Sequence, residues 1–254
     1  MDLIWTYDGR VKVSRMSDDS RRIVLLNYYI VSITTAKKLG YHTVVYTDQN
    51  SVDFFKNLVD EVHVVDDYEN SILWDYLKIK VLDEREGDYC LIDGDVILRK
   101  NLPEFTADIT FDTYEIGNWG REYKNPVNEL TDIGIGDCIE IWDNLKKPVI
   151  NCGILFIKNK KDREDYVNLW KKYNKWINEN HTKHSLDIDY STMVGAQYLL
   201  TLMVKSKGMT KHNLNTNMGE EGTYHRHYFG LTKFNESIVP KDHIIDYNKS
   251  KNII

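Results

Sequence analysis

Two aspartates at the end of an apolar run are the residues of this sequence with the clearest capacity for chemistry. Asp93 and Asp95 follow the apolar segment 89–92 and are separated by Gly94. Hard divalent cations such as Mg²⁺ and Mn²⁺ take oxygen ligands and are often shared between protein carboxylates and substrate phosphates. A buried strand that ends at this pair delivers both carboxylates to the sheet edge where open α/β sheets bind ligands. The pair therefore indicates a cation site that serves transfer from a nucleotide-activated donor.

An acidic loop that only faces water is the competing explanation for the pair. An EF-hand is a poor fit, because the third oxygen ligand, the central Gly and the distant Glu are missing from their required positions.

A second group lies near the C-terminus, where His227, Gly230 and Lys233 fall on one short stretch. An imidazole can complete the coordination of Mn²⁺, a glycine lets the backbone approach a diphosphate, and a lysine neutralises phosphate charge. The alternative is an aromatic loop packed under a sheet with solvated histidines. His225 competes with His227 for the role of ligand.

Three single residues stand out between these groups. Lys78 lies on an expected helix just upstream of the acidic pair, Asn151 interrupts an apolar strand in which Asn is disfavoured, and Gln197 lies in or beside a helix. Each has an ordinary alternative as a solvated lysine, a turn cap or a surface glutamine.

The elements that must position these residues alternate between strand and helix. Apolar and β-branched runs predict strands over 3–7, 42–48 and 61–66, and apolar spacing predicts helices over about 20–39, 52–58 and 72–82. This order predicts an α/β fold with a mostly parallel central sheet flanked by helices. We further expect a strand over 149–157, helices over about 162–178 and 190–204, and loops between 108 and 147 that border an acceptor site.

Composition limits the classes of function. The chain has 254 residues, 42% of them hydrophobic, and a formal net charge of −6, which disfavours a nucleic-acid partner without excluding one. Its three cysteines have no CxxC spacing, which suits a reducing compartment. The sequence shows no signal-like N-terminal segment and no apolar run that spans a bilayer. We therefore expect a cytoplasmic protein without stable membrane insertion.

Considered together, these motifs resemble the GT-A glycosyltransferases. An apolar strand ending in Asp-x-Asp, an Asn-x-Gly strand, a Gln-bearing helix and a His-x-x-Gly-x-x-Lys stretch occur in that order from about residue 3 to 233. The set is most similar to the glycogenin-like and bacterial lipooligosaccharide galactosyltransferase-like group, glycosyltransferase family 8. This resemblance implies a single GT-A domain over 1–254, with the nucleotide-sugar mainly on 1–100 and the acceptor side and C-terminal metal and diphosphate loop mainly on 101–240.

The resemblance also implies roles for individual residues. Metal ligands are implied at Asp93, Asp95 and His227, and contacts to the diphosphate at Gly230 and Lys233. The end of the first strand at Thr6, Tyr7 and Asp8 matches the segment that meets the base and ribose. Lys78 matches a basic donor contact, and Asn151 and Gln197 match positions that line the transferred sugar. Two departures are Ala196, where the family has an acidic residue before the Gln, and a first strand without the family's usual small residues.

The implied reaction is transfer of a sugar from a nucleotide-diphosphate sugar to a glycan, protein or small-molecule acceptor. The family usually uses UDP as the nucleotide, and the implied cofactor is Mn²⁺ or Mg²⁺. Asp95, Lys233 and Gln197 are then the catalytic candidates, and retention at the anomeric carbon is implied. Inversion instead requires a carboxylate base, for which the candidates are Asp187, Asp189, Glu220 and Glu221. Two rival functions are a nucleotidyltransferase that makes sugar nucleotides and a non-catalytic nucleotide-sugar or glycan-binding protein.

Overall fold

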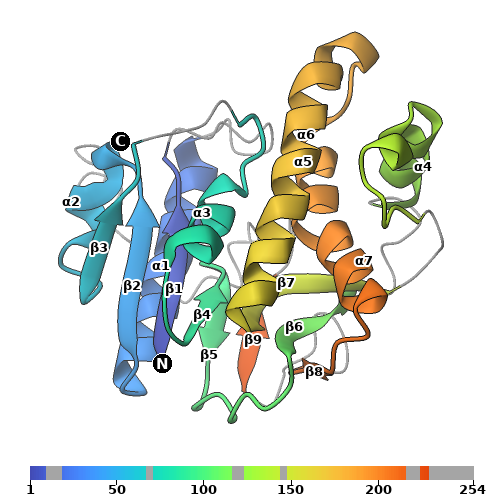
Figure 1. Cartoon of the computed structure of the whole chain (residues 1–254). Coiled ribbons are helices and arrows are strands. Elements are labelled where there is room, and N and C mark those ends of the chain that lie inside the picture. The colour runs from blue at the N-terminus through green and yellow to red at the C-terminus, as the bar shows by residue number, and fades with distance from the viewer. Residues whose placement is uncertain (10–18, 67–70, 116–122, 144–147, 216–223, 229–254) are drawn as a thin grey trace. The chain divides into compact units, whose positions relative to one another are not determined.

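A computed structural model gives the fold of the chain (Figure 1). It describes residues 1–9, 19–66, 71–115, 123–143, 148–215 and 224–228. These fall into two compact units. The first takes in 1–66, 88–104 and the C-terminal segment from 219, and the second takes in 67–87 and 105–218.

The first unit is built on four parallel strands in the order β3-β2-β1-β4. Their bounds are Asp2–Tyr7 for β1, His42–Thr47 for β2, Glu61–Val64 for β3 and Tyr89–Ile92 for β4. Helix α1 (Asp19–Lys38) connects β1 to β2, and a 3-10 turn, η2 (Gln49–Ser51), with the short α2 (Val52–Phe55) connects β2 to β3. The long crossovers are what parallel pairing requires. A separate antiparallel pair joins β5 (Val96–Leu98) to β9 (His225–His227).

Burial explains why β1 and β4 are so apolar. All four residues of β4 are buried, as are Leu3, Ile4 and Trp5 of β1. A strand covered on both faces reads as a continuous apolar run instead of an alternating one. One hydrogen-bond chain fixes α1 over this core, because the indole of Trp5 donates to Ser32 Oγ (2.9 Å) and Ser32 donates to the Val96 carbonyl (2.5 Å). Helix α1 is thereby attached to the residue that directly follows Asp95.

The second unit holds three strands in the order β7-β6-β8 and most of the helices. Strand β6 (Ile109–Glu115) runs antiparallel to β7 (Val149–Ile157) and parallel to β8 (Lys211–Asn213). Its register against β7 shifts between Phe111 and Thr113. The helical elements are α3 (Tyr76–Glu84), α4 (Lys124–Asp132), the 3-10 turn η4 (Ile135–Asp137), α5 (Lys160–His184), α6 (Ile188–Met193), the π-helical turn η5 (Val194–Tyr198) and α7 (Leu199–Ser206).

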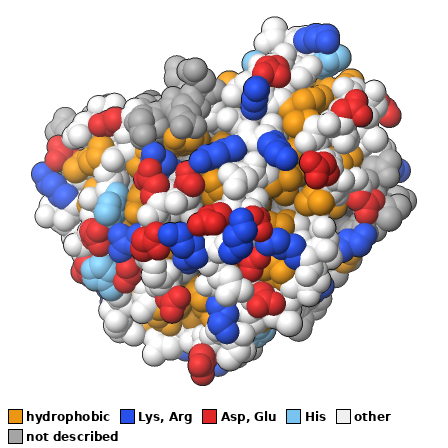
Figure 2. All heavy atoms as spheres, in the orientation of Figure 1, with side chains coloured by type: hydrophobic (Ala, Val, Ile, Leu, Met, Phe, Trp, Pro, Cys, Tyr) orange, Lys and Arg blue, Asp and Glu red, His pale blue; other side chains and the backbone are white. Residues whose placement is uncertain are grey.

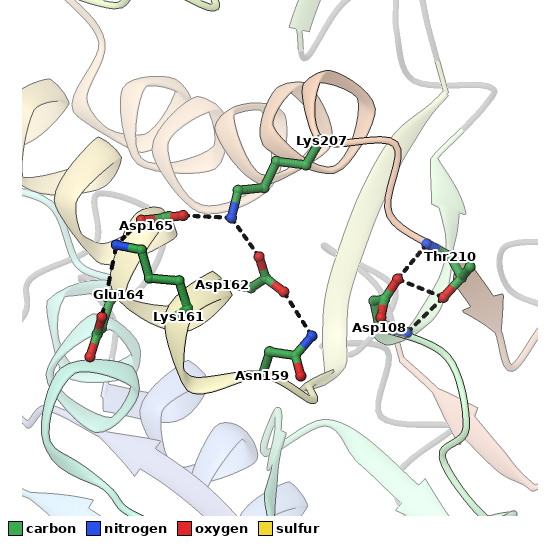
Figure 3. Close-up of polar contacts among 8 residues, drawn as sticks. All are labelled: Asp108, Asn159, Lys161, Asp162, Glu164, Asp165, Lys207 and Thr210. Carbon is green, nitrogen blue, oxygen red and sulfur yellow. Dashed lines mark hydrogen bonds and ion pairs between the residues drawn. The ribbon is translucent and has the colours of Figure 1, made fainter.

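Ion pairs hold the outer surfaces of the helices of the second unit. Lysine and arginine side chains alternate with acidic ones on the face shown in Figure 2, consistent with the pairs Lys80–Glu84 and Lys171–Asp83. Figure 3 shows Lys207, at the end of α7, between two aspartates of α5's first turns, Asp162 and Asp165, each 2.5 Å away. Exposed pairs of this kind stabilise a protein by about 0–1 kcal/mol each. These pairs therefore contribute little to the stability of the second unit, which comes mainly from its apolar core.

The expected order of elements up to β4 is confirmed, as are the strand 149–157 and the two later helices. The expectation of loops between 108 and 147 is wrong, because β6 and α4 lie there. Polar Asp112 and Glu115 interrupt the apolar pattern of β6, and Pro126 interrupts that of α4. A proline is compatible with the first turn of a helix, where the N–H has no partner within the helix.

The helix expected over 72–82 begins later, at Tyr76, with Asp75 at its N-cap position. The α/β class with mostly parallel strands and flanking helices is confirmed. A single domain over 1–254 stays a prediction. Among the described residues, no helix combines the length and the apolar character that a bilayer crossing requires.

Candidate metal centre and donor-binding residues

The first unit brings three potential metal ligands together at the carboxyl end of β4. A tight turn follows the strand, in which the Val96 N–H donates to the Asp93 carbonyl (3.0 Å). Strand β5 then pairs with β9, with Val96 opposite His227, and the Tyr228 N–H donates to the Asp95 carbonyl (3.1 Å). The antiparallel pair therefore places His227 beside the acidic turn, although the two lie more than 130 residues apart in the sequence.

The geometry of the three ligands fits a small divalent cation. One ligand atom each from Asp93, Asp95 and His227 lies within 4.8 Å of the others, and His227 Nε2 is 3.3 Å from Asp95 Oδ1. In an octahedral site with bonds of about 2.1 Å, neighbouring ligand atoms lie about 3 Å apart and opposite ones about 4 Å apart. The side chains of Asp95 and His227 are 9% and 5% exposed. Two carboxylates and one imidazole are a donor set that suits Mn²⁺ or Mg²⁺.

Tyr29 of α1 packs against the glycine between the two aspartates. A Cβ at Gly94 would lie 2.3 Å from the Tyr29 ring, which is closer than any real contact. The Tyr29 hydroxyl donates to the Thr6 carbonyl (2.6 Å), so one side chain touches both the acidic turn and the end of β1. Burial, followed by the charges of Asp93 and Asp95, raises the pKa of Tyr29 well above its usual value, and the phenol therefore stays a neutral donor.

A second tyrosine of α1, Tyr28, contacts the residue that directly follows β9. The ring of Tyr28 lies 5.0 Å from that of Tyr228, and the Arg226 guanidinium lies 4.8 Å from the Tyr228 ring centre. Burial raises the pKa of Tyr28 to about 12, with smaller contributions from Tyr228 and Asp95. Tyr28 and Tyr228 therefore form an aromatic wall near Asp95.

His225, the alternative ligand, is fully buried and lies opposite Leu98. It is not among the residues that converge.

The end of β1 lies beside the metal ligands, because β1 and β4 are parallel neighbours and end at the same edge. The Tyr7 carbonyl accepts from Thr47 Oγ1 (2.7 Å), and its ring packs between Tyr29 (5.3 Å) and Phe55 (5.4 Å). Tyr7 is therefore largely occupied inside the protein. Thr6 and Asp8, on either side of Tyr7, are partly exposed.

The second unit joins Asn151 and Gln197 through two residues that the sequence did not single out. Asn151 Nδ2 donates to Glu115 Oε1 (2.5 Å), and the Tyr123 hydroxyl donates to Glu115 Oε2 (2.7 Å). The same hydroxyl contacts the side-chain amide of Gln197. Glu115 is 4% exposed. A buried carboxylate thus holds both amides, one directly and one through a phenol.

The atom of Gln197 that faces the Tyr123 hydroxyl is the side-chain oxygen Oε1. The same hydroxyl also contacts Glu115 Oε2. Since a phenol carries one proton, the carboxylate and the amide oxygen compete for it. Gln197 also lies in the π-helical turn η5, a distortion that is frequent at functional sites.

Lys78 also belongs to the second unit, on the first turn of α3, and is partly exposed. Directly before the helix, Asp75 is buried and accepts a hydrogen bond from the Trp170 indole (2.8 Å). Burial raises the pKa of Asp75 to about 7, and the Trp170 bond and the Lys78 charge oppose this shift.

Other predicted residues lie elsewhere. Gly230 and Lys233, with Glu220 and Glu221, fall outside the described residues. Asp187 caps α6 by accepting from the Tyr190 N–H (3.1 Å), and Asp189 lies in the first turn of that helix. Tyr28, Tyr29, Glu115 and Tyr123 had no motif to mark them. The one available signal was Gly94, because a glycine inside a functional turn often indicates a close neighbour.

Several solved glycosyltransferase structures are similar to this chain in fold. The galactosyltransferase LgtC, in complex with donor and acceptor sugar analogues, is 14% identical over 77% of this chain and 70% of its own, with a TM-score of 0.43. Mouse xyloside xylosyltransferase 1 is 10% identical over 84% of both chains, with a TM-score of 0.44. The glycosyltransferase GlyE of Streptococcus pneumoniae is 8% identical over 84% of this chain and 45% of its own, also with a TM-score of 0.44.

These proteins are of the class that the motifs resemble. No protein-family model matches the sequence, and no curated protein matches it.

Proposed function

We propose that this chain is a metal-dependent glycosyltransferase that moves a sugar from a nucleotide-diphosphate sugar, with UDP as the nucleotide, to an acceptor with retention at the anomeric carbon. The observation that carries the proposal is the convergence of Asp93, Asp95 and His227 beside the carboxyl end of β1. A donor whose nucleoside lies on β1 presents its diphosphate to these ligands.

Asp93, Asp95 and His227 are the residues that hold the cation in this proposal. When bound, a divalent ion supplies Lewis-acid stabilisation of the leaving diphosphate. Gly94 keeps the backbone of the turn close to Tyr29, and Tyr29 holds the turn against Thr6. The aromatic wall of Tyr28 and Tyr228 reduces competition from water.

The remaining roles belong to side chains that meet the donor sugar and diphosphate. Lys233 stabilises the charge that grows on the departing diphosphate, and loss of such a group costs about 10²–10³ in rate. Lys78 is a further donor contact. Asn151 and Gln197 bind the transferred sugar, oriented by Glu115 and Tyr123. Retention requires no protein base opposite the leaving group, which is consistent with an amide at position 197.

Thermal unfolding with UDP, ADP and GDP, each with and without Mn²⁺, tests the donor site. A ligand that binds only the native state raises the unfolding midpoint. We expect a manganese-dependent rise with UDP that is lost in Asp95→Asn. Asp88→Asn is the matched control, because it changes an exposed carboxylate at the opposite end of the same strand. A rise that survives in Asp95→Asn contradicts the metal site.

The rival functions give different results in the same measurement. A rise with nucleoside triphosphates alone indicates a nucleotidyltransferase. A UDP-sugar that binds but is neither transferred nor hydrolysed indicates a binding protein.

A further inference from the structure

We propose that the groove between α4 and the start of α6 binds the acceptor, and that the acceptor is a neutral oligosaccharide. The inference rests on the glycosyltransferase function proposed above and names the substrate class of its acceptor side. All residues concerned belong to the second unit.

The groove is a cavity lined by both apolar and polar side chains. Its volume is about 320 Å³, within the range of small-molecule sites. Buried Pro126, Leu130 and Leu186 lie among its lining residues. More exposed Glu129 and Tyr190 also line it. It therefore combines an apolar base with an aromatic ring and hydrogen-bonding groups.

The position of the groove relates it to Gln197. Tyr123, which contacts the Gln197 amide, directly precedes α4, and the first turns of α4 form one wall of the groove. On the opposite wall, Tyr190 belongs to α6, which continues directly into the π-helical turn η5 that carries Gln197. An acceptor whose reacting sugar is at Gln197 extends its next sugars into this groove.

The chemistry of the lining selects neutral sugars. Sugar rings offer hydroxyl groups to carboxylates and amides, and their apolar faces pack on aromatic rings. Asn125, Glu129 and Asp187 supply the polar groups, and Tyr190 supplies a ring with a polar tip. Two of the lining residues are acidic and none is basic. A carboxylated or phosphorylated acceptor would therefore be repelled, since like charges at close range are unfavourable.

Ligand-observed NMR with free disaccharides tests this site. The probes are lactose, maltose, cellobiose and diacetylchitobiose, with sialyllactose as the anionic counterpart of lactose, each measured with and without UDP and Mn²⁺. We expect at least one neutral disaccharide to bind and sialyllactose to bind more weakly than lactose. Tyr190→Ala and Glu129→Ala should each weaken binding about tenfold, which corresponds to about 1.4 kcal/mol. Tyr190→Phe should retain most of the affinity because the ring remains.

Glu140→Ala is the control for charge, because Glu140 is 89% exposed and does not line the groove. It should leave sugar binding unchanged. The UDP-dependent rise in unfolding temperature should be normal in every groove variant, which separates failure of the groove from failure of the donor site.

Three results with the disaccharides would overturn the inference. They are no binding by any of the four neutral disaccharides, full affinity in both Tyr190→Ala and Glu129→Ala, and tighter binding of sialyllactose than of lactose. Binding of octyl lactoside without binding of methyl lactoside would also overturn it, because recognition would then rest on the lipid chain and not on the sugar.

Discussion

Replacing Asp75 with asparagine should change how the stability of this protein depends on pH. Asp75 is buried at the start of α3, and one of its oxygens accepts from the Trp170 indole. Among the described residues, its other oxygen, Oδ1, has no hydrogen-bond partner. A carboxylate in this position is poorly solvated, so folding favours the protonated form.

The size of the effect follows from the two pKa values. The pKa of Asp75 rises from its ordinary 3.8 to about 7 in the folded protein. Between these values the folded state holds a proton that the unfolded state has released, so the free energy of unfolding falls as pH rises. The stabilisation that protonated Asp75 gives the folded state is fully present below about pH 4 and is lost by about pH 7. Between pH 5 and pH 8 the two pKa values correspond to a loss of about 2.5 kcal/mol.

Urea unfolding at pH 5 and pH 8 measures this directly. Asp75→Asn keeps an oxygen for Trp170 but cannot ionise, so wild type should lose about 2.5 kcal/mol more than the variant between the two pH values. Asp53→Asn, whose carboxylate is 81% exposed, controls for the loss of a titrating group and should parallel wild type. Equal pH dependence in wild type and Asp75→Asn would refute the reasoning, because Asp75 would then be as well solvated as a surface aspartate.

Two further changes test the neighbourhood of the predicted ligands. Gly94→Ala places a methyl group against the Tyr29 ring, and we expect a loss of about 1–3 kcal/mol in stability with a weaker manganese-dependent rise in unfolding temperature. The double variant Gly94→Ala, Tyr29→Leu should regain part of the stability and part of the manganese-dependent rise. If it regains neither, the clash with the Tyr29 ring is not the cause of the losses. Tyr123→Phe removes the hydroxyl between Glu115 and Gln197 and should cost about 1–3 kcal/mol in urea unfolding. Unchanged stability would mean that the hydroxyl is not part of a buried network.

The sequence predicts the elements around the acidic pair well, because their signals are local. The run 89–92 is apolar and short, and a strand that ends in Asp-Gly-Asp has few other interpretations. The approach of His227 to Asp95 was expected only from the resemblance. Its physical cause is the pairing of β5 with β9, a contact between distant segments that no local pattern encodes.

The prediction fails where buried polar residues are satisfied by distant partners. Asp112 and Glu115 make β6 look like a loop, yet Asn215 donates to Asp112 (2.9 Å) and Asn151 donates to Glu115. These partners lie 103 and 36 residues away. A polar residue in a strand is read as exposed unless its partner is known, so both β6 and the role of Glu115 were missed.

The contact between Tyr29 and Gly94 has a consequence for how related sequences can diverge. The middle position of an Asp-x-Asp motif is formally free, but here it has no room for any side chain while an aromatic ring occupies position 29. The two positions should therefore change together. A relative with a larger residue between its aspartates should have a small one at the matching point of α1, and it would then lose the hydroxyl that donates to the Thr6 carbonyl. The contact between positions 29 and 94 would then be visible as covariation of these two positions among related sequences.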